Sequence, residues 1–384
     1  MAEIVTVYDP YQVKAILDGV QKGRAIKRPN FLQSFFGDRG LSESDSIRMD
    51  IEFNIGNPMG QPVNPDVDAP ELDLPQYGHK AYGWTYVKEA VTSRSDPDFM
   101  RRIGDALNVG ADPTVVLAED FRKRQQFSLN AMENYEELVA RDILVSGKHI
   151  AKSDYATTVV TDFEKSVATT SAEYVAGEWG NVDLTSITHN GGAGKAAWSA
   201  TGGTKVVDPL QDLKMWASYM SRWDSLDSIV MSYDAYLVLE AALNGDLYKN
   251  ARDLTINVAP EDRIYETFGS ALETFEGVTL QRVLRLDNRK IPVYTYDGKY
   301  TLRTGTDRTK QSYMPNGYVL MIPTSANQVK RYGRIQHLKA QWRAMPLWIN
   351  QWMNERHGTF GQEMHRALFM GLRRPDSVKS IKVI

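Results

Sequence analysis

The sequence predicts an α+β protein with a β-rich body, an inserted α/β lobe and two segments that project from the body. Three observations predict this architecture: an alternating strand pattern over 46–53, an uninterrupted helical pattern over 113–146, and a mixture of helices and strands over 208–312. The 384 residues suffice for two or three hydrophobic cores, since a domain commonly holds about 100–200 residues.

The composition excludes several classes of protein. Lys and Arg number 45 and Asp and Glu 48, so the net charge is −3, whereas proteins that bind nucleic acid mainly through phosphate contacts are normally basic. Any nucleic-acid contact is therefore expected to be local. Cysteine is absent, which excludes disulfides, thiolate metal sites and a cysteine nucleophile. The chain also lacks a signal-peptide pattern and any apolar run of the ~18 residues that a membrane span needs, so we expect a cytosol-like compartment and no membrane.

Residues 1–45 are predicted to form an N-terminal arm. A short amphipathic pattern over 13–20 precedes the basic stretch 22–28, and the apolar run 31–36 follows it. This segment holds too few apolar residues for a core of its own. We therefore expect the arm to pack on the body of the protein or on a neighbouring chain.

Residues 46–92 are predicted to form a long β-hairpin. Apolar and charged residues alternate over 46–53, and a second strand is expected over 80–91. Five prolines lie between residues 55 and 78, and proline cannot donate a hydrogen bond to a strand ladder. These residues are therefore expected to form an extended tip, and loops this long are usually functional or disordered.

The region 93–207 is predicted to form a peripheral domain around one long helix, which we call the spine helix. Asp112 and Pro113 are typical of an N-cap and a first helical residue, and no Gly or Pro follows before Gly147. At ~1.5 Å per residue a helix over 113–146 is roughly 50 Å long. Strands and turns are expected over 148–207.

The rest of the chain is predicted to form an axial α/β domain over 208–312 and a return to the peripheral domain over 313–384. Asp208 and Pro209 repeat the signal for a helix start. Helices are expected over 209–222, 233–243, 261–272 and 325–332, and a loop up to residue 312. Strands are expected over 228–231, 276–284, 291–296, 317–322, 361–370 and 377–383.

No catalytic or metal-binding motif emerges from the sequence. The six histidines are scattered, and none forms a helical pair or belongs to a zinc-protease motif. Gly-rich residues 191–194 precede Lys195, but His189 and Ala196 stand where a phosphate-binding loop needs Gly and Ser or Thr. We therefore expect no catalytic residue, no cofactor and no bound metal.

Several stretches, in their order along the chain, resemble the major capsid proteins of tailed bacteriophages, in the lambda-type branch of the Hong Kong 97 fold. Residues 31–36 with the strand that follows resemble that family's arm and extended loop, and 232–236 resemble part of its mid-lobe segment. The most similar stretch is 314–320 followed by 331–336, and 359–384 resembles the C-terminal strand. The order of these stretches, more than any single motif, supports the resemblance.

The resemblance implies a structural protein, not an enzyme, that self-assembles as hexamers and pentamers into an icosahedral shell around double-stranded viral DNA. The implied partners are further copies of the chain, a portal, a decoration protein and weakly, non-specifically held DNA. A separate scaffolding protein is also implied, because no extra domain precedes the arm. The implied location is the virion capsid, assembled in the host bacterial cytoplasm. Two alternatives stay open: a nanocompartment (encapsulin-like) shell protein of the same fold, and a soluble α/β enzyme.

Charge suggests where neighbouring subunits meet. Residues 49–79 hold six acids and no Lys or Arg, so the acidic tip is expected to lie across a basic arm or spine helix of the adjacent subunit. A tip that is merely solvated is the alternative. The residues expected at this interface are Asp66, Asp68, Glu71, Asp73, Arg122, Lys123, Arg124, Lys27, Arg28, Phe35 and Phe36.

Two further expectations concern cross-linking and tryptophan. Some relatives join a loop lysine covalently to a distant asparagine, and the lack of lysine over 49–79 predicts that this bond does not form here. The segment that holds Trp342, Trp348 and Trp352 departs from the family. These residues are expected in a core or an interface, with a ligand-stacking site as the less common alternative.

Overall fold

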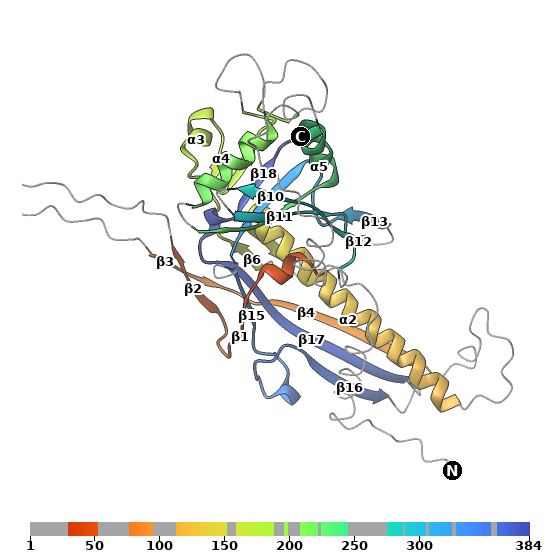
Figure 1. Ribbon diagram of the computed structural model, residues 1–384. Helices are drawn as coiled ribbons and strands as arrows, with labels where there is room; N and C mark the ends of the chain where they lie inside the picture. The colour runs from red at the N-terminus through yellow and green to blue at the C-terminus, as the bar shows by residue number, and fades with distance from the viewer. Residues whose placement is uncertain are drawn as a thin grey trace, which may run out of the picture.

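One long helix, α2 (Pro113–Ser146), runs across the molecule and contacts strands of both larger sheets (Figure 1). The computed structural model describes residues 30–52, 77–94, 113–151, 159–187, 196–198, 208–221, 224–244, 275–286, 289–304, 307–324, 328–354 and 359–384. The predicted spine helix is confirmed at both ends. Gly147 follows it with a φ of 72°, a left-handed conformation that favours glycine and ends helices.

The lower sheet has five strands in the order β1–β15–β17–β16, with β4 also paired to β17. Its strands are β1 (Asp38–Leu41), β4 (Thr85–Arg94), β15 (Gln328–Tyr332), β16 (Trp348–Asn354) and β17 (Thr359–Leu372). The 14-residue strand β17 has three partners, β4, β15 and β16, so it organises this sheet.

Two predictions about these strands are wrong. The helix expected over 325–332 is strand β15 where the structure describes it, because its backbone pairs in parallel with β1 and antiparallel with β17. The single strand expected over 80–91 is divided between two sheets. Its first part belongs to β3 (Tyr77–Tyr82), which pairs with β2 (Ile47–Glu52), and the rest lies in β4.

The upper sheet has seven strands in the order β10–β11–β9–β14–β18–β8–β7. Its strands are β7 (Val167–Ala168), β8 (Asn181–Asp183), β9 (Leu226–Met231), β10 (Val278–Leu286), β11 (Arg289–Tyr296), β14 (Tyr318–Pro323) and β18 (Lys379–Lys382). Helices α4 (Pro209–Ser221) and α5 (Tyr233–Asn244) pack with it in the largest apolar core. The sheet draws strands from all three regions 93–207, 208–312 and 313–384, so these boundaries do not coincide with sheet membership.

The remaining described elements are short. Three hairpin pairs stand outside the larger sheets: β2–β3, β5–β6 (Lys148–Ala151, Val159–Asp162) and β12–β13 (Lys299–Thr304, Asp307–Ser312). The last pair replaces most of the loop predicted up to residue 312. Helix α3 (Ser171–Ala176), which was not predicted, begins with a capping box between Thr170 and Glu173. Three 3₁₀ turns complete the list: η1 (Leu32–Phe35), η5 (Leu338–Ala340) and η7 (Pro375–Ser377).

Most other predicted elements are confirmed by these strands and helices, with ends that differ by a few residues. The helix predicted over 261–272 and the hairpin tip lie outside the described residues. Within the described part of the chain, no helix combines the length and apolar character needed to cross a membrane.

Candidate functional site: the roots of the arm and the hairpin

The arm root, residues 30–36, is attached to the spine helix through its backbone. The amides of Leu32 and Gln33 donate to the two carboxylate oxygens of Glu137, at 2.7 and 3.1 Å, and the hydroxyl of Tyr296 donates to the same carboxylate at 3.0 Å. Glu137 is completely buried. Burial raises its pKa to about 7, although these three hydrogen bonds and the charge of Lys330 favour the ionised form.

The neighbouring residue, Glu136, links the arm root to the lower sheet. Its oxygens form ion pairs with Lys330 of β15 at 2.7 Å and with Arg366 of β17 at 2.5 Å. The Lys330 ammonium also donates to the side-chain oxygen of Gln33 at 2.8 Å. All four residues are at least 90% buried, and removing one partner of a buried ion pair leaves an uncompensated charge. The network therefore fixes the arm root, the helix and the sheet relative to one another.

Aromatic contacts complete the attachment of the arm root. Phe31 packs edge-to-face against Phe35 at 5.2 Å, Tyr294 at 5.3 Å and Tyr296 at 5.6 Å between ring centroids. Phe36 is 0% exposed within the apolar core. Among the residues expected at the subunit interface, Phe35 and Phe36 thus pack on their own body, which is the first of the two alternatives predicted for the arm.

The hairpin root consists of β2 and β3, paired from Ile47 opposite Tyr82 to Glu52 opposite Tyr77. Ile47 and Ile51 are buried, while Asp50 on the other face is exposed. The predicted alternation is therefore confirmed. Packing of the inner face against the body holds the root in place.

The chain turns from the hairpin root into β4 at residues 83–84. The indole nitrogen of Trp84 donates to the carbonyl of Ser44 at 2.9 Å. Its ring lies so close to Gly333 that a Cβ at residue 333 would approach it to 2.4 Å. The predicted continuous strand is interrupted here because Tyr82 and the residues before it pair with β2, whereas Thr85 and the residues after it pair with β17.

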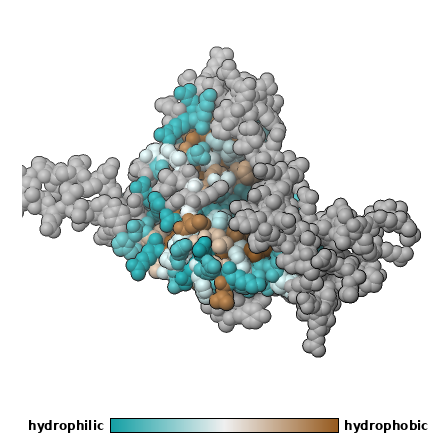
Figure 2. Space-filling model, turned by 90° about the horizontal axis from the view of Figure 1, so that it is seen from below, coloured by the Kyte–Doolittle hydropathy of each residue, from teal (hydrophilic) through white to brown (hydrophobic). Residues whose placement is uncertain are grey.

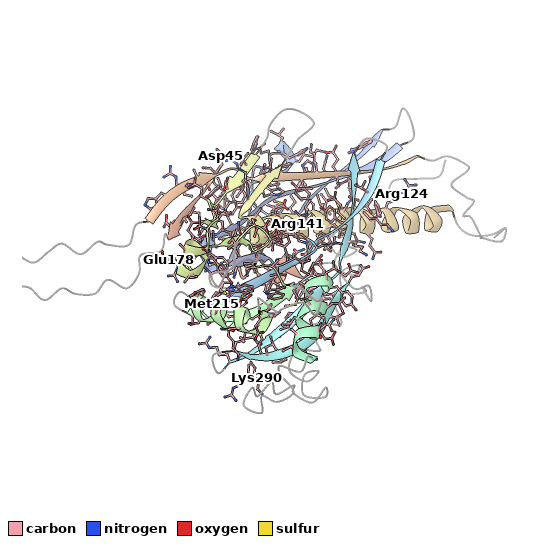
Figure 3. All side chains as sticks on the ribbon, turned by 90° about the horizontal axis from the view of Figure 1, so that it is seen from above. Asp45, Arg124, Arg141, Glu178, Met215 and Lys290 are labelled. Carbon is pink, nitrogen blue, oxygen red and sulfur yellow. The ribbon has the colours of Figure 1, made fainter. Side chains whose placement is uncertain are left out.

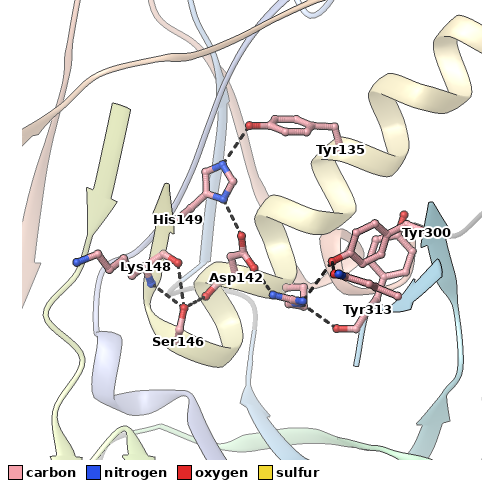
Figure 4. Close-up of polar contacts among 9 residues, drawn as sticks. Tyr135, Asp142, Ser146, Lys148, His149, Tyr300 and Tyr313 are labelled. Atoms are coloured by element: carbon pink, nitrogen blue, oxygen red, sulfur yellow. Dashed lines mark hydrogen bonds and ion pairs between the residues drawn. The ribbon is translucent and has the colours of Figure 1, made fainter. Parts of the chain in front are cut away.

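A polar cluster lies near the C-terminal end of the spine helix (Figure 4). His149 lies between the Tyr135 hydroxyl at 3.2 Å and the Asp142 carboxylate at 2.8 Å, and Arg141 pairs with Asp142 at 2.5 Å. Burial, together with the charge of Asp142, raises the pKa of Tyr135 to about 12. The cluster joins α2 to β5, the strand that holds His149. It is not an open site, because His149 is only 3% exposed. The described residues contain no group of three or more His, Asp or Glu side chains arranged to hold a metal ion.

The structure describes few of the charged residues expected at the interface. Arg124 lies partly buried on the spine helix, on the stretch that extends to the right in Figure 3. Arg122 and Lys123 belong to the same helix, but their side chains lie outside the described part of the chain. The other charged interface residues, which also lie outside it, are Lys27, Arg28, Asp66, Asp68, Glu71 and Asp73.

The tryptophan segment is divided between core and surface. Trp348 on β16 packs against His337 at 4.2 Å and His365 at 4.9 Å between ring centroids. Trp352 on the same strand covers Gly361. Trp342, by contrast, is 46% exposed.

The buried carboxylates of the arm root were missed by the sequence analysis. Glu136 lies four residues after Met132 and three before Val139, on the buried apolar stripe that continues to Ile143. An acid on such a stripe indicates a buried partner of opposite charge. That signal would have identified Glu136, although not Lys330 and Arg366, which come from distant strands.

Comparisons with known proteins agree with this architecture. A family model described as phage major capsid protein E matches residues 113–383. The chain is similar to the crystal structure of a putative capsid protein of a prophage from E. coli CFT073, with 14% identity, a TM-score of 0.61, and coverage of 97% of this chain and 98% of that one. No curated protein matches.

Two other solved structures are similar at lower scores. One is the capsid of an empty GTA particle, with 11% identity, a TM-score of 0.48, and coverage of 94% and 91%. The other is the capsid of cyanophage P-SCSP1u, with 13% identity, a TM-score of 0.47, and coverage of 94% and 89%. The predicted Hong Kong 97-type capsid fold is confirmed, and the chain belongs to the phage major capsid protein E family, as a structural protein of the tailed-phage capsid and not an enzyme.

Proposed function

We propose that this major capsid protein, which forms an icosahedral shell, does so through hexamers and pentamers in which the arm and the hairpin hold neighbouring copies together. One observation supports this most: Glu136 and Glu137 anchor the arm root to the helix and sheet on which the hairpin root also packs. A body to which the arm and the hairpin are both firmly attached suits an assembly in which these two segments contact neighbouring copies.

The contacts between copies follow from charge. The acidic residues Asp66, Asp68, Glu71 and Asp73 face basic residues of the adjacent subunit. The basic runs of the arm and the spine helix supply the candidates Lys27, Arg28, Arg122, Lys123 and Arg124. One exposed pair contributes only ~0–1 kcal/mol. Several pairs in each contact, repeated around a closed shell, set the register of assembly.

The proposed partners are a separate scaffolding protein, a portal, a decoration protein and double-stranded DNA held by weak, non-specific contacts. The net charge of −3 fits a shell that encloses DNA without binding it tightly. Assembly takes place in the cytoplasm of the bacterial host, and the product is the capsid of the virion.

Sedimentation and negative-stain microscopy of the protein co-expressed with its scaffolding protein test this proposal. Closed shells that sediment far faster than a 43.3 kDa subunit are expected. A folded protein that stays monomeric at every concentration contradicts it. Shells that enclose a cargo enzyme in place of DNA would favour the nanocompartment alternative.

A further inference from the structure

An exposed apolar and basic loop lies next to the hairpin root. We call residues 333–347, between β15 and β16, the Trp342 loop. Leu338 is 83% exposed and Trp342 46% exposed, and the loop lies at the lower end of the molecule in Figure 1. Figure 2 views this lower face and shows brown apolar residues among hydrophilic ones. Contiguous exposed apolar surface marks interaction sites, and Leu338 and Trp342 lie only four residues apart in this loop.

The backbone of the Trp342 loop is held in a fixed conformation. Two of its own residues, Ile335 and Ala340, are buried, and the amide of Ile335 donates to the carbonyl of Arg343 at 3.0 Å. Gln341 and Trp342 have φ angles of 52° and 56°, a left-handed conformation that non-glycine residues rarely adopt and that recurs at functional sites. The backbone of the loop therefore holds Trp342 in a defined position on the surface.

The loop is also basic. Residues 328–354 contain no Asp or Glu, whereas Arg334, Lys339 and Arg343 lie in the loop. Arg334 pairs with Asp45 and lies over the Trp342 ring, with 5.3 Å between its guanidinium carbon and the ring centroid. Lys339 and Arg343 are exposed beside it.

Residues 53–76 have the complementary chemistry. They hold five prolines and four acids, Asp66, Asp68, Glu71 and Asp73, and no Lys or Arg. Proline-containing segments bind aromatic surfaces, because proline has little conformational freedom to lose. Acidic residues at the same time pair with neighbouring cations. An exposed tryptophan flanked by Lys339 and Arg343 fits both requirements.

The outer end of the hairpin root lies away from the Trp342 loop of the same chain. The inner end of the root adjoins the Trp342 loop, because Trp84 packs on Gly333 and Asp45 pairs with Arg334. From there β2 extends over six residues to Glu52, which at ~3.3 Å per residue places the outer end roughly 15–20 Å farther along the strand. Strand β2 therefore ends, at Glu52, away from the Trp342 loop of its own chain.

We propose that the Trp342 loop is the receptor for residues 53–76 of a second copy of this chain. This inference rests on the proposed function, since it names the surface that the acidic segment contacts in the shell. It replaces the basic run of the spine helix as the main receptor. The spine helix is the alternative receptor for this segment, because it also combines an exposed aromatic side chain, Phe127 at 77% exposure, with a nearby cation, Arg124.

Engineered disulfides test the pairing directly, because the chain has no cysteine of its own. The test variant is Asp68→Cys with Lys339→Cys. Comparison variants join Asp68→Cys with Arg124→Cys or with Lys290→Cys, and Asp68→Cys alone controls for bonds between two tips. Lys290 is exposed and lies at the opposite end of Figure 3 from Asp45. Two cysteines with Cα atoms more than ~7 Å apart cannot be bridged.

Particles made with the scaffolding protein are oxidised and run on a non-reducing gel. The Lys339 pair should give a ladder of covalent oligomers that reduction removes, whereas the Lys290 pair and the single variant stay near 43.3 kDa. Particles without a ladder for the Lys339 pair, or a ladder only for the Arg124 pair, overturn the proposal. If the unmodified protein forms no particles at all, the proposed function itself fails.

Charge reversal is a second, independent test. Lys339→Glu with Arg343→Glu should reduce particle yield by about tenfold or more, because two attractive contacts per subunit become repulsive. The matched control, Arg289→Glu with Lys290→Glu, changes the charge equally on the exposed part of β11 and should leave the yield unchanged. Adding Asp66→Lys and Asp68→Lys should restore assembly of the first variant. A normal yield, or a loss that this reversal does not restore, contradicts the pairing.

Discussion

Replacing Glu137 by alanine should release the arm root from the spine helix. The side chain accepts hydrogen bonds from two backbone amides, Leu32 and Gln33, and from the Tyr296 hydroxyl. All three donors lie in a buried site. The alanine variant leaves them without an acceptor unless the arm root detaches and its amides bond to water.

The cost follows from counting these donors. A buried donor without a partner costs ~1–3 kcal/mol, so three of them predict a loss of at least about 3 kcal/mol in the free energy of unfolding. Glu137→Gln keeps one acceptor oxygen and should lose about 1–2 kcal/mol at pH 5, where the Glu137 side chain is itself protonated. Either loss is a large fraction of the ~5–15 kcal/mol that stabilises a typical domain.

The effect also depends on pH. The pKa of Glu137 is raised from its ordinary value of 4.5 to about 7 in the folded chain. Between these values the folded protein holds a proton that the unfolded chain has released, so stability falls as pH rises through this window. The cost is fully present above pH 7 and amounts to about 3 kcal/mol, at ~1.4 kcal/mol per pKa unit. Glu137→Gln should remove this part of the pH dependence.

Urea denaturation of the unassembled subunit at pH 5 and pH 8 measures both effects, and limited proteolysis reports release of the arm root. Glu43→Gln is the matched control, because Glu43 is exposed in the loop between β1 and β2. If Glu137→Ala costs no more than the control, Glu137 does not hold the arm root. If Glu137→Gln shows the same slope of stability with pH as the unmodified protein, the slope does not come from Glu137.

Three further predictions concern assembly. Met132→Pro should abolish shells, because proline removes a hydrogen bond from the middle of α2 and clashes one turn back, at a cost of ~3 kcal/mol or more. Met132→Leu is the control, and normal shells from the proline variant would show that an intact helix is not required. Boiled mature particles should give one band near 43.3 kDa, since residues 49–79 lack lysine, and a covalent ladder would overturn this. The triple variant Asp66→Lys, Asp68→Lys, Glu71→Lys should assemble poorly at low salt and less poorly at high salt, because salt screens exposed charges. Yields equal to those of the unmodified protein across the salt series would mean that the tip is only a solvated loop.

Local signals in the sequence predict the spine helix well. Pro113 begins it and Gly147 ends it as expected, because a first-turn proline and a left-handed glycine act within a few residues of the helix ends. The same holds for α4, which begins at Pro209. The alternation over 46–53 likewise predicts β2, because one face of that strand is buried.

Contacts between distant residues explain what the sequence did not reveal. Residues 328–332 look helical alone, but pairing with β1 and β17 makes them a strand, and burial of Lys330 depends on Glu136, which lies 194 residues away. In the β12–β13 hairpin only Tyr300 and Leu302 of β12 alternate as apolar residues, and β13 is polar throughout, so the alternation is too short to mark a pair of strands. The arm-root site combines residues from η1, α2, β15 and β17, and only its acid on an apolar helix stripe was visible in the sequence.

Electron cryomicroscopy of shells assembled from the unmodified protein would show both segments in place. We expect hexamers and pentamers in which the arm root stays bound to Glu137 of its own chain. We also expect residues 53–76 of each copy to reach an adjacent copy. A shell in which these residues contact only their own subunit, or in which the arm root has left the spine helix, would contradict the proposed assembly.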